Sequence, residues 1–300
     1  MRISGEAPVV VGVNGTAAGL AAVRLGAREA VARGRPLRVV HVFGWSGAGP
    51  VTPAGRDGAG GPPHTGGAYT GARRAAGAIV AAAVTAARRS TPTVQVSGEV
   101  LDGQPVRTLL QQSRAADMML LGDDDLASVP APAIDSVLIQ VVARAWCPVV
   151  VARGLRPPAG PLLAAVDGSP GSVMALRHAA AEARCRRVRV DPVHVVERAG
   201  TGAEEAGRRV LAEALAAVPE LTGVHGRLLI GDPAGAIVRA SRHARMVIVS
   251  PRGSDGAALL GQVARELLRR CACPTVFVHG ATAAQPRYAG TVPGAGALAS

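Results

Sequence analysis

Residues 8–43 read PVVVGVNGTAAGLAAVRLGAREAVARGRPLRVVHVF, and residues 161–196 read PLLAAVDGSPGSVMALRHAAAEARCRRVRVDPVHVV. The two stretches align without a gap at an offset of 153 residues. This offset places the Asn-Gly-Thr turn at 14–16 on the Asp-Gly-Ser turn at 167–169. A repeat of this length is large enough for each copy to form a unit of its own.

The later parts of the two copies match as well. Gly-Gln-Pro at 103–105 recurs as Gly-Asp-Pro at 231–233, and a Cys-Pro dipeptide at 147–148 recurs at 273–274. The chain is therefore a tandem duplication, and we call its halves the first and second repeats.

Hydrophobic patterning predicts the same elements in each repeat. Residues 9–13 form a continuous apolar run, which is typical of a strand buried on both faces of a parallel sheet. A turn follows, then an apolar stripe at helical spacing over 20–31, and then a second apolar strand over 37–43. Five strands alternating with four helices predict a doubly wound parallel α/β sandwich in each repeat.

Composition shifts along the chain predict its boundaries. We expect one domain over 1–152, a linker over 153–160, a second domain over 161–280 and a disordered tail over 281–300. The first repeat carries about 25 residues more than the second, in a Gly- and Pro-rich segment over 44–71 that predicts a long loop.

The composition excludes several classes of function. The chain has a net charge of +12 and 33 basic residues, all of which are Arg. These arginines are scattered and aromatic residues make up only 2% of the chain, so the pattern indicates no specific nucleic-acid partner. The high content of Arg, Ala, Gly and Pro is typical of proteins encoded by a GC-rich genome, such as that of an actinobacterium.

Membrane, metal and redox roles are not indicated either. The longest apolar stretch, over 75–87, is too short to span a bilayer, and no signal segment opens the chain, so we expect a cytoplasmic protein without a membrane partner. The four cysteines lack ligand spacing and are interpreted as small apolar residues at strand entrances, so we predict no metal site.

Several of these motifs resemble those of the universal stress protein family in its tandem form. They are the Val-Asp-Gly-Ser turn at 166–169, the His-Val-Val strand at 194–196, the Gly-x-Pro before the third helix and the Cys-Pro ending. The resemblance covers about 270 residues of the chain. It implies the adenine-nucleotide α-hydrolase-like fold and a stress-response role. The ATP-binding members of the family carry G-x2-G-x9-G-[ST] after the fourth strand.

The first repeat keeps the spacing of this motif but not its chemistry. Gly122 is followed by four carboxylates where a triphosphate would lie: Asp123, Asp124, Asp125 and Asp135. Asn14 replaces the aspartate that follows the first strand. Like charges would repel the phosphates. A solvated acidic loop and a divalent-cation site are the two alternative interpretations of these acids.

The second repeat keeps more of the chemistry but shortens the loop. Seven residues separate Gly253 from Gly261, where the family has nine. Ser250 replaces the first glycine and Gln262 the final serine, while Arg252 is placed to pair with a phosphate. The resemblance implies ATP as the ligand, held by the following residues: Ala165, Asp167, Gly168, Ser169, Val195, Ser250, Arg252, Gly253, Gly261, Gln262 and Val263.

No catalytic residues are predicted. Ser169 lacks the G-x-S-x-G context of a nucleophile, and His41 and His194 are interpreted as hydrogen-bonded sheet histidines. Three functions remain as alternatives: a nucleotide-binding stress protein, an interaction protein of the same fold without nucleotide, and a weak ATPase.

The last strand of each repeat, at 149–152 and 275–278, is a short apolar edge. We expect the two edges to pair within one chain, which would make it a pseudo-dimer and leave further homodimerisation open.

Overall fold

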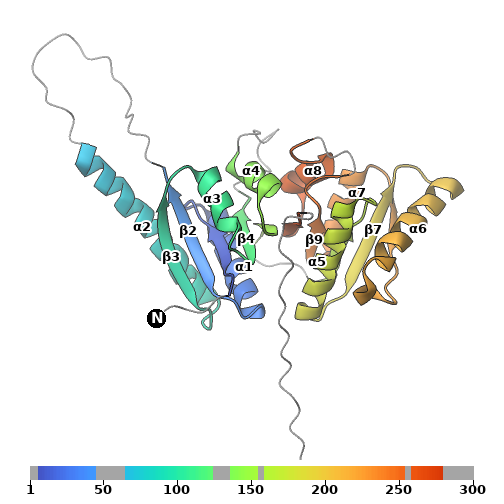
Figure 1. Ribbon diagram of the computed structural model, residues 1–300, viewed down its shortest axis with the longest axis horizontal. Helices are drawn as coiled ribbons and strands as arrows, with labels where there is room; N and C mark the ends of the chain where they lie inside the picture. Colours follow the sequence, from blue (N-terminus) through green and yellow to red (C-terminus); the bar gives the residue numbers. More distant parts are fainter. Residues whose placement is uncertain (1–5, 45–64, 124–135, 155–158, 254–257, 280–300) are drawn as a thin grey trace, which may run out of the picture.

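The computed structural model describes residues 6–44, 65–123, 136–154, 159–253 and 258–279. Here ten strands form one continuous sheet in the order β3-β2-β1-β4-β5-β10-β9-β6-β7-β8 (Figure 1). The strands of the first repeat are β1 Val9–Gly12, β2 Leu37–Phe43, β3 Val96–Asp102, β4 Met118–Gly122 and β5 Val149–Ala152. Those of the second repeat are β6 Leu162–Ala165, β7 Val190–Val196, β8 Arg227–Ile230, β9 Met246–Val249 and β10 Thr275–Phe277.

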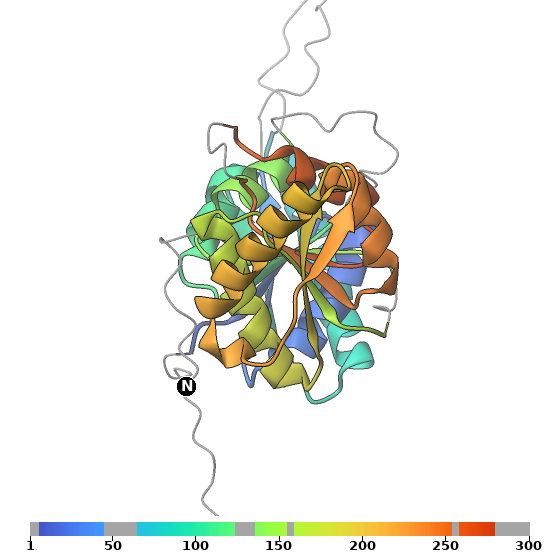
Figure 2. The ribbon, with the colours of Figure 1, turned by 90° about the vertical axis from the view of Figure 1, so that its right-hand side faces the viewer.

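Helices cover both faces of this sheet (Figure 2). One face carries α1 Ala17–Ala32, α2 Thr65–Ser90, α5 Pro170–Arg186 and α6 Thr201–Ala216. The other carries α3 Pro105–Ser113, α4 Val137–Arg144, α7 Pro233–Ala240 and α8 Gln262–Arg270. Two single 3-10 turns complete the second repeat: η2 Pro219–Leu221 and η3 Ser241–His243. The doubly wound α/β fold predicted from the sequence is confirmed.

The continuous apolar strands follow from this layering. Val9 and Val11 face the core under α1 and α2, whereas Val10 faces the core under α3 and α4. All three side chains are buried because successive side chains of a strand point to opposite faces and both faces are covered.

The helix after the long insertion starts earlier than its pattern predicts. Helix α2 begins at Thr65, so residues 65–71 are helical although they fall in the expected loop over 44–71. Tyr69 packs edge-on against Phe43 with ring centroids 5.7 Å apart, and Arg73 pairs with Asp102. These tertiary contacts anchor a Gly-rich helix end that local propensity disfavours. The remainder of the expected loop and the tail at 281–300 lie outside the described residues.

The two repeats join through their final strands. β5 and β10 pair antiparallel, with Val149 opposite Phe277 and Val151 opposite Thr275, whereas the other strand pairs are parallel. The predicted pairing of the final strands within one chain is confirmed. Because each strand covers the exposed edge of the other, the two five-stranded sheets become one.

Residues just beyond these strands cross to the opposite repeat. A guanidinium nitrogen of Arg153 donates to the Leu268 carbonyl in α8, and His279 Nε2 lies 2.8 Å from the Val142 carbonyl in α4. The two contacts are equivalent under the repeat, since the offset that aligns the two Cys-Pro dipeptides also aligns Arg153 with His279 and Val142 with Leu268.

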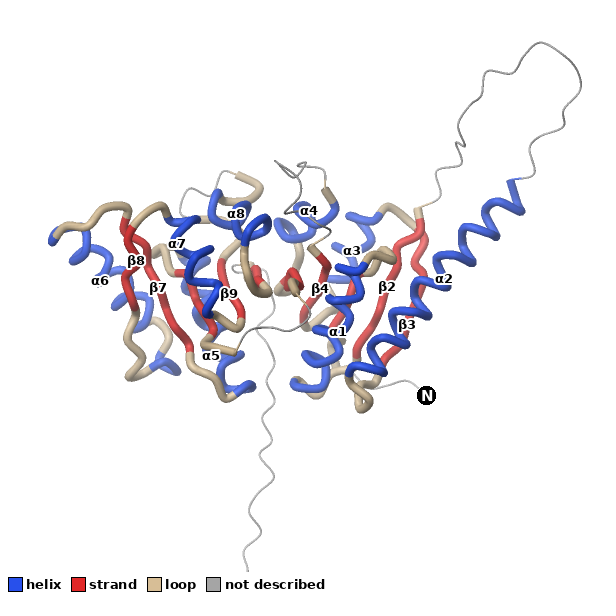
Figure 3. Tube along the Cα trace, turned by 180° about the vertical axis from the view of Figure 1, so that it is seen from behind, coloured by secondary structure: helices blue, strands red, loops and turns tan. Residues whose placement is uncertain are grey.

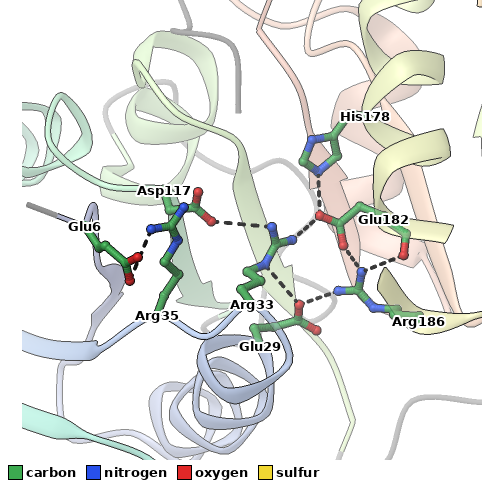
Figure 4. Close-up of polar contacts among 8 residues, drawn as sticks. All are labelled: Glu6, Glu29, Arg33, Arg35, Asp117, His178, Glu182 and Arg186. Atoms are coloured by element: carbon green, nitrogen blue, oxygen red, sulfur yellow. Dashed lines mark hydrogen bonds and ion pairs between the residues drawn. The ribbon is translucent and has the colours of Figure 1, made fainter. Parts of the chain in front are cut away.

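On the opposite face of the sheet a buried ion cluster joins α1 to α5 (Figure 4). Glu29 of α1 and Arg33, the residue that follows this helix, correspond to Glu182 and Arg186 of α5. The ion pairs run between the repeats: Arg33 binds Glu182, and Arg186 binds Glu29. Arg186 also binds Glu182 within its own helix. The Glu182 side chain is 1% exposed and the Arg33 side chain 5% exposed, so these charges are almost fully removed from water.

Two members of the cluster break its symmetry. Asp117 Oδ2 lies 3.4 Å from Arg33 Nη1, and His178 Nε2 lies 3.5 Å from Glu182 Oε1. Burial lowers the pKa of His178 to about 3, and Arg33 and Arg186 act in the same direction. The imidazole therefore stays neutral beside a carboxylate that two guanidinium groups already share.

Substitution of Glu182 by Ala is expected to destabilise the chain by about 3–5 kcal/mol, because it leaves buried guanidinium charges without this partner. Equilibrium unfolding in urea measures the change. The matched control is Arg208→Ala, which removes the exposed pairs to Glu204 and Glu205 on α6 and should cost less than about 0.5 kcal/mol. Equal effects of the two substitutions would show that the cluster contributes no more than surface pairs.

Acid should destabilise the chain partly through His178. The folded protein keeps this imidazole neutral down to about pH 3, while the unfolded chain binds a proton near pH 6.5, so stability falls as the pH drops between these values. His178→Leu introduces the residue that the first repeat has at the equivalent position, Leu25. It should reduce the slope of the free energy of unfolding against pH by up to about 1.4 kcal/mol per pH unit in this range. Urea unfolding from pH 7 to pH 4 tests it, and an unchanged slope would contradict it.

Candidate functional site

The candidate site lies at the carboxyl edge of the parallel strands of the second repeat. β6 pairs with β7 on one side and with β9 on the other, so the chain leaves neighbouring strands in opposite directions at this edge. Such a switch point leaves a crevice beyond the strand ends, which is the usual ligand position in doubly wound sheets. Ala165 pairs with Val193, and this register places Val195 level with Asp167 at the same edge.

The turn after β6 is held by its own side chains. Asp167 Oδ1 accepts hydrogen bonds from the Ser169 backbone N–H at 2.9 Å and from the Ser169 hydroxyl at 2.5 Å. Ser169 Oγ in turn accepts from the Ser172 N–H at 3.2 Å and caps α5. Gly168 has φ +83, a conformation that other residues rarely adopt. Oδ1 of Asp167 therefore serves the turn, which leaves Oδ2 for other contacts.

The loop after β9 folds back onto this turn. The Gly261 N–H donates to the Pro251 carbonyl at 2.9 Å. A Cβ added at Gly253 would lie 3.3 Å from Asp167 Oδ2, and one added at Gly261 would lie 3.3 Å from the Gly253 nitrogen. Asp167, Gly253 and Gly261 thus meet at one point. Residues 254–257 of the same loop lie outside the described residues.

Helix α8 starts beside this point. Gly261 is its N-cap and no side chain caps its first turn. Gln262 is exposed, whereas Val263 is half-buried and packs on the core under α7 and α8. The first N–H groups of a helix attract anions, so this end of α8 favours a negatively charged ligand.

Three of the predicted site residues have mainly a packing role. Ala165, Val195 and Val263 are all partly buried against the same core. They form an apolar wall next to the polar turn.

Arg252 is exposed on this loop and forms no ion pair with another described residue. It lies near the buried His279, which follows β10. Burial lowers the pKa of His279, the Val142 carbonyl opposes the shift, and Arg252 adds to it. The guanidinium group is therefore available at the edge of the site, close to where the repeats meet.

The first repeat has the same frame with different chemistry. Asn14 Oδ1 accepts from the Thr16 N–H at 3.2 Å and from its hydroxyl at 2.7 Å, as Asp167 does for Ser169. Asp123 Oδ2 lies 3.5 Å from Arg153 Nη1, so the first acid of the loop forms an ion pair. The other three acids of this loop, Asp124, Asp125 and Asp135, lie outside the described residues. The choice between a solvated acidic loop and a cation site therefore stays a prediction. Among the described residues no group of three or more His, Cys, Asp or Glu is arranged to hold a metal ion.

The contact between the end of the fourth strand of each repeat and the first turn of its first helix differs between the repeats. In the first repeat a Cβ on Gly122 would lie 2.5 Å from the Ala18 carbonyl carbon, a backbone atom, so only glycine fits there. In the second repeat Ser250 stands at the position of Gly122 and Gly171 at that of Ala18, and a Cβ on Gly171 would lie 2.5 Å from Ser250 Oγ. The glycine of this contact is therefore at the strand end in the first repeat and on the helix in the second.

The histidines and cysteines have structural surroundings. His41 Nδ1 lies 2.8 Å from the Val13 carbonyl, and His194 Nδ1 lies 2.8 Å from the Val166 carbonyl, so both repeats use the same strand-to-turn hydrogen bond. Burial raises the pKa of the Cys147 thiol to about 12. The four cysteines are free, and Cys147, Cys271 and Cys273 are buried. The interpretation as apolar residues at strand entrances is wrong for Cys185, which lies in the last turn of α5 and is exposed.

No helix in the described part of the chain is long and apolar enough to cross a membrane.

Comparisons with known proteins agree with this architecture. The family model described as the universal stress protein family matches residues 7–153 and again residues 159–279. A universal stress protein of Mycobacterium tuberculosis is 32% identical over 294 residues, which cover 90% of this chain and 96% of the relative. One from Mycolicibacterium smegmatis is 29% identical over 298 residues, covering 91% of this chain and 97% of the relative. These mycobacterial relatives fit the expected actinobacterial composition.

Solved structures share the fold over nearly the whole chain. A universal stress protein from Archaeoglobus fulgidus superposes with a TM-score of 0.66 at 15% identity and covers 91% of this chain and 98% of its own. A putative universal stress protein from Pseudomonas aeruginosa gives 0.55 at 16% identity, with 91% and 92% covered. With two consecutive family matches and a relative at 32% identity over nearly its full length, the chain belongs to the universal stress protein family, in its tandem form.

Proposed function

We propose that this protein is a non-catalytic, nucleotide-binding stress-response protein that holds one ATP per chain, in the second repeat. The observation that carries the proposal is the meeting of Asp167, Gly253 and Gly261 at the carboxyl edge of β6 and β9. Neither glycine has a side chain that would keep phosphate oxygens away from the loop backbone, and the uncapped end of α8 adds a favourable dipole.

The charges around the two loops support binding in the second repeat over the first. In the second repeat Arg252 is free of described carboxylate partners and available for a charge-assisted hydrogen bond to a phosphate. In the first, the sequence supplies further carboxylates next to Asp123. Two like charges 4 Å apart repel by about 1 kcal/mol even in bulk water, so these acids disfavour a polyphosphate.

One observation favours the alternative, an interaction protein without nucleotide. The hydrogen bond from the Gly261 N–H to the Pro251 carbonyl at 2.9 Å draws the shortened loop inward and brings the two glycines together. A phosphate would have to fit outside this contact or open it. In this alternative the chain acts through its surfaces alone, and no nucleotide accompanies the purified protein.

Titration calorimetry with ATP and magnesium is expected to give a stoichiometry near one. Asp167→Ala should abolish binding, and so should Gly253→Asp, because it adds a carboxylate where a Cβ would lie 3.3 Å from Asp167 Oδ2. Asn14→Ala is the matched control in the first repeat and should leave the titration unchanged. A stoichiometry near two, or loss of binding in Asn14→Ala, would place the nucleotide elsewhere.

Phosphate release from ATP should stay at the level of a control without protein. The described residues around Asp167 and Arg252 include no group of three or more side chains that could hold a metal ion, and an arginine alone only anchors charge. Asp255 follows Gly253 by two positions in the sequence and lies outside the described residues, and we take its carboxylate as the candidate to test. Turnover clearly above the control that disappears in Asp255→Asn would identify an ATPase instead.

A further inference from the structure

Helices α1 and α2 of the first repeat run side by side (Figure 3). Side chains of the two helices line a groove. The groove consists of two hollows, of about 530 and about 260 Å³, which share Leu20 and Ala82 in their walls. Its length follows from the helical rise of 1.5 Å per residue, which gives about 16 Å between Ala78 and Arg89. We call it the α1–α2 groove.

The two ends of the α1–α2 groove differ in chemistry. The end near the β1 turn is apolar, with Val13, Ile79 and Leu20 in its walls. The other end is lined by Arg24 and Arg89, together with hydroxyl side chains of α2. A ligand that matches both ends has an apolar body and one anionic group.

Neither arginine has an acidic partner in the described part of the chain. Arg24 is half-buried and Arg89 is exposed, and neither appears in an ion pair between described residues, whereas most of the other half-buried arginines do. Burial lowers the pKa of the neighbouring Arg28; Glu29 opposes the shift and Arg24 adds to it. An anion placed between the guanidinium groups of Arg24 and Arg89 would give both a partner of opposite charge.

The second repeat closes the equivalent position. Arg177, which aligns with Arg24, donates from Nη2 to the Ala217 carbonyl at 3.1 Å at the end of α6. The residue that aligns with Ala217 in the first repeat is Arg89. In the second repeat, Arg177 thus has a helix-end carbonyl as its partner. In the first repeat, a second cation, Arg89, stands at that position instead. The basic end of the groove therefore belongs to the first repeat alone.

We propose that the α1–α2 groove binds a free fatty acid, with its carboxylate between Arg24 and Arg89 and its chain along Leu20, Ala82 and Ile79. Arginine is suited to a carboxylate because its planar group offers two parallel donors. The larger hollow, of about 530 Å³, falls within the range of small-molecule sites, about 300–1,000 Å³. The groove lies between α1 and α2 of the first repeat. The proposed fatty-acid site is therefore separate from the nucleotide site, which we propose at the carboxyl edge of the strands in the second repeat.

Dodecanoate is a suitable probe, since its extended chain is comparable in length with the groove. Titration calorimetry of the full chain, below the micelle concentration, should show saturable binding of one dodecanoate. Arg24→Gln and Arg89→Gln should each weaken it about tenfold or more, because each removes a charge-assisted hydrogen bond. Ala82→Leu, which fills the middle of the groove with a good helix former, should abolish it. The matched control Arg177→Gln should bind as the wild type does.

Probes that lack one half of this chemistry complete the test. Butyrate lacks the long chain and dodecyltrimethylammonium carries the opposite charge, so neither should bind. Binding of dodecyltrimethylammonium, uptake of several dodecanoates per chain, or equal weakening by Arg24→Gln and Arg177→Gln would overturn the proposal. So would binding to vesicles of anionic phospholipid without binding of dodecanoate. Saturating ATP should leave the dodecanoate titration unchanged, which separates this result from that of the nucleotide site.

Discussion

The antiparallel pairing of β5 with β10 is the contact on which the whole molecule depends. Each repeat ends in a strand whose outer edge would otherwise expose unpaired backbone groups, and the other repeat supplies the partner. The ion cluster of α1 and α5 secures one face of this seam, and the crossing contacts of Arg153 and His279 secure the other. The pairing therefore fixes the distance and orientation of the two candidate ligand edges.

Fusion has let the two repeats diverge around a shared frame. The reciprocal Arg33–Glu182 and Arg186–Glu29 pairs preserve a two-fold arrangement, while Asp117 and His178 each occur on one side only. In a symmetric assembly of separate subunits every change would appear twice at such a seam. In one chain, the second repeat can retain a polar turn with glycines while the first acquires acids and an open basic groove.

Sequence patterns predicted the fold because they are local. The apolar run at 9–13, the helical stripe after it and the Cys-Pro endings each specify an element, and their repetition specified the pairing of the final strands. The ion cluster escaped prediction although Glu29 and Glu182 align, because its partners lie 149 and 157 residues apart and touch only after both sheets join. The first turns of α2 were missed because a Gly-rich segment is held helical by Phe43 and Arg73 contacts. At the site, the residue types were evident, but the inward fold of the loop at Gly261 depends on a backbone hydrogen bond that no residue pattern encodes.

The exchange of small residues between Gly122 with Ala18 and Ser250 with Gly171 constrains how this loop can change. A methyl group on Gly122 would meet backbone atoms of Ala18, and one on Gly171 would meet the Ser250 side chain. Either change therefore requires the facing segment to shift, because a packed contact leaves no free space for an added methyl group. The loop after β4 or β9 and the first turn of α1 or α5 consequently constrain each other's sequence, although the two segments are far apart along the chain.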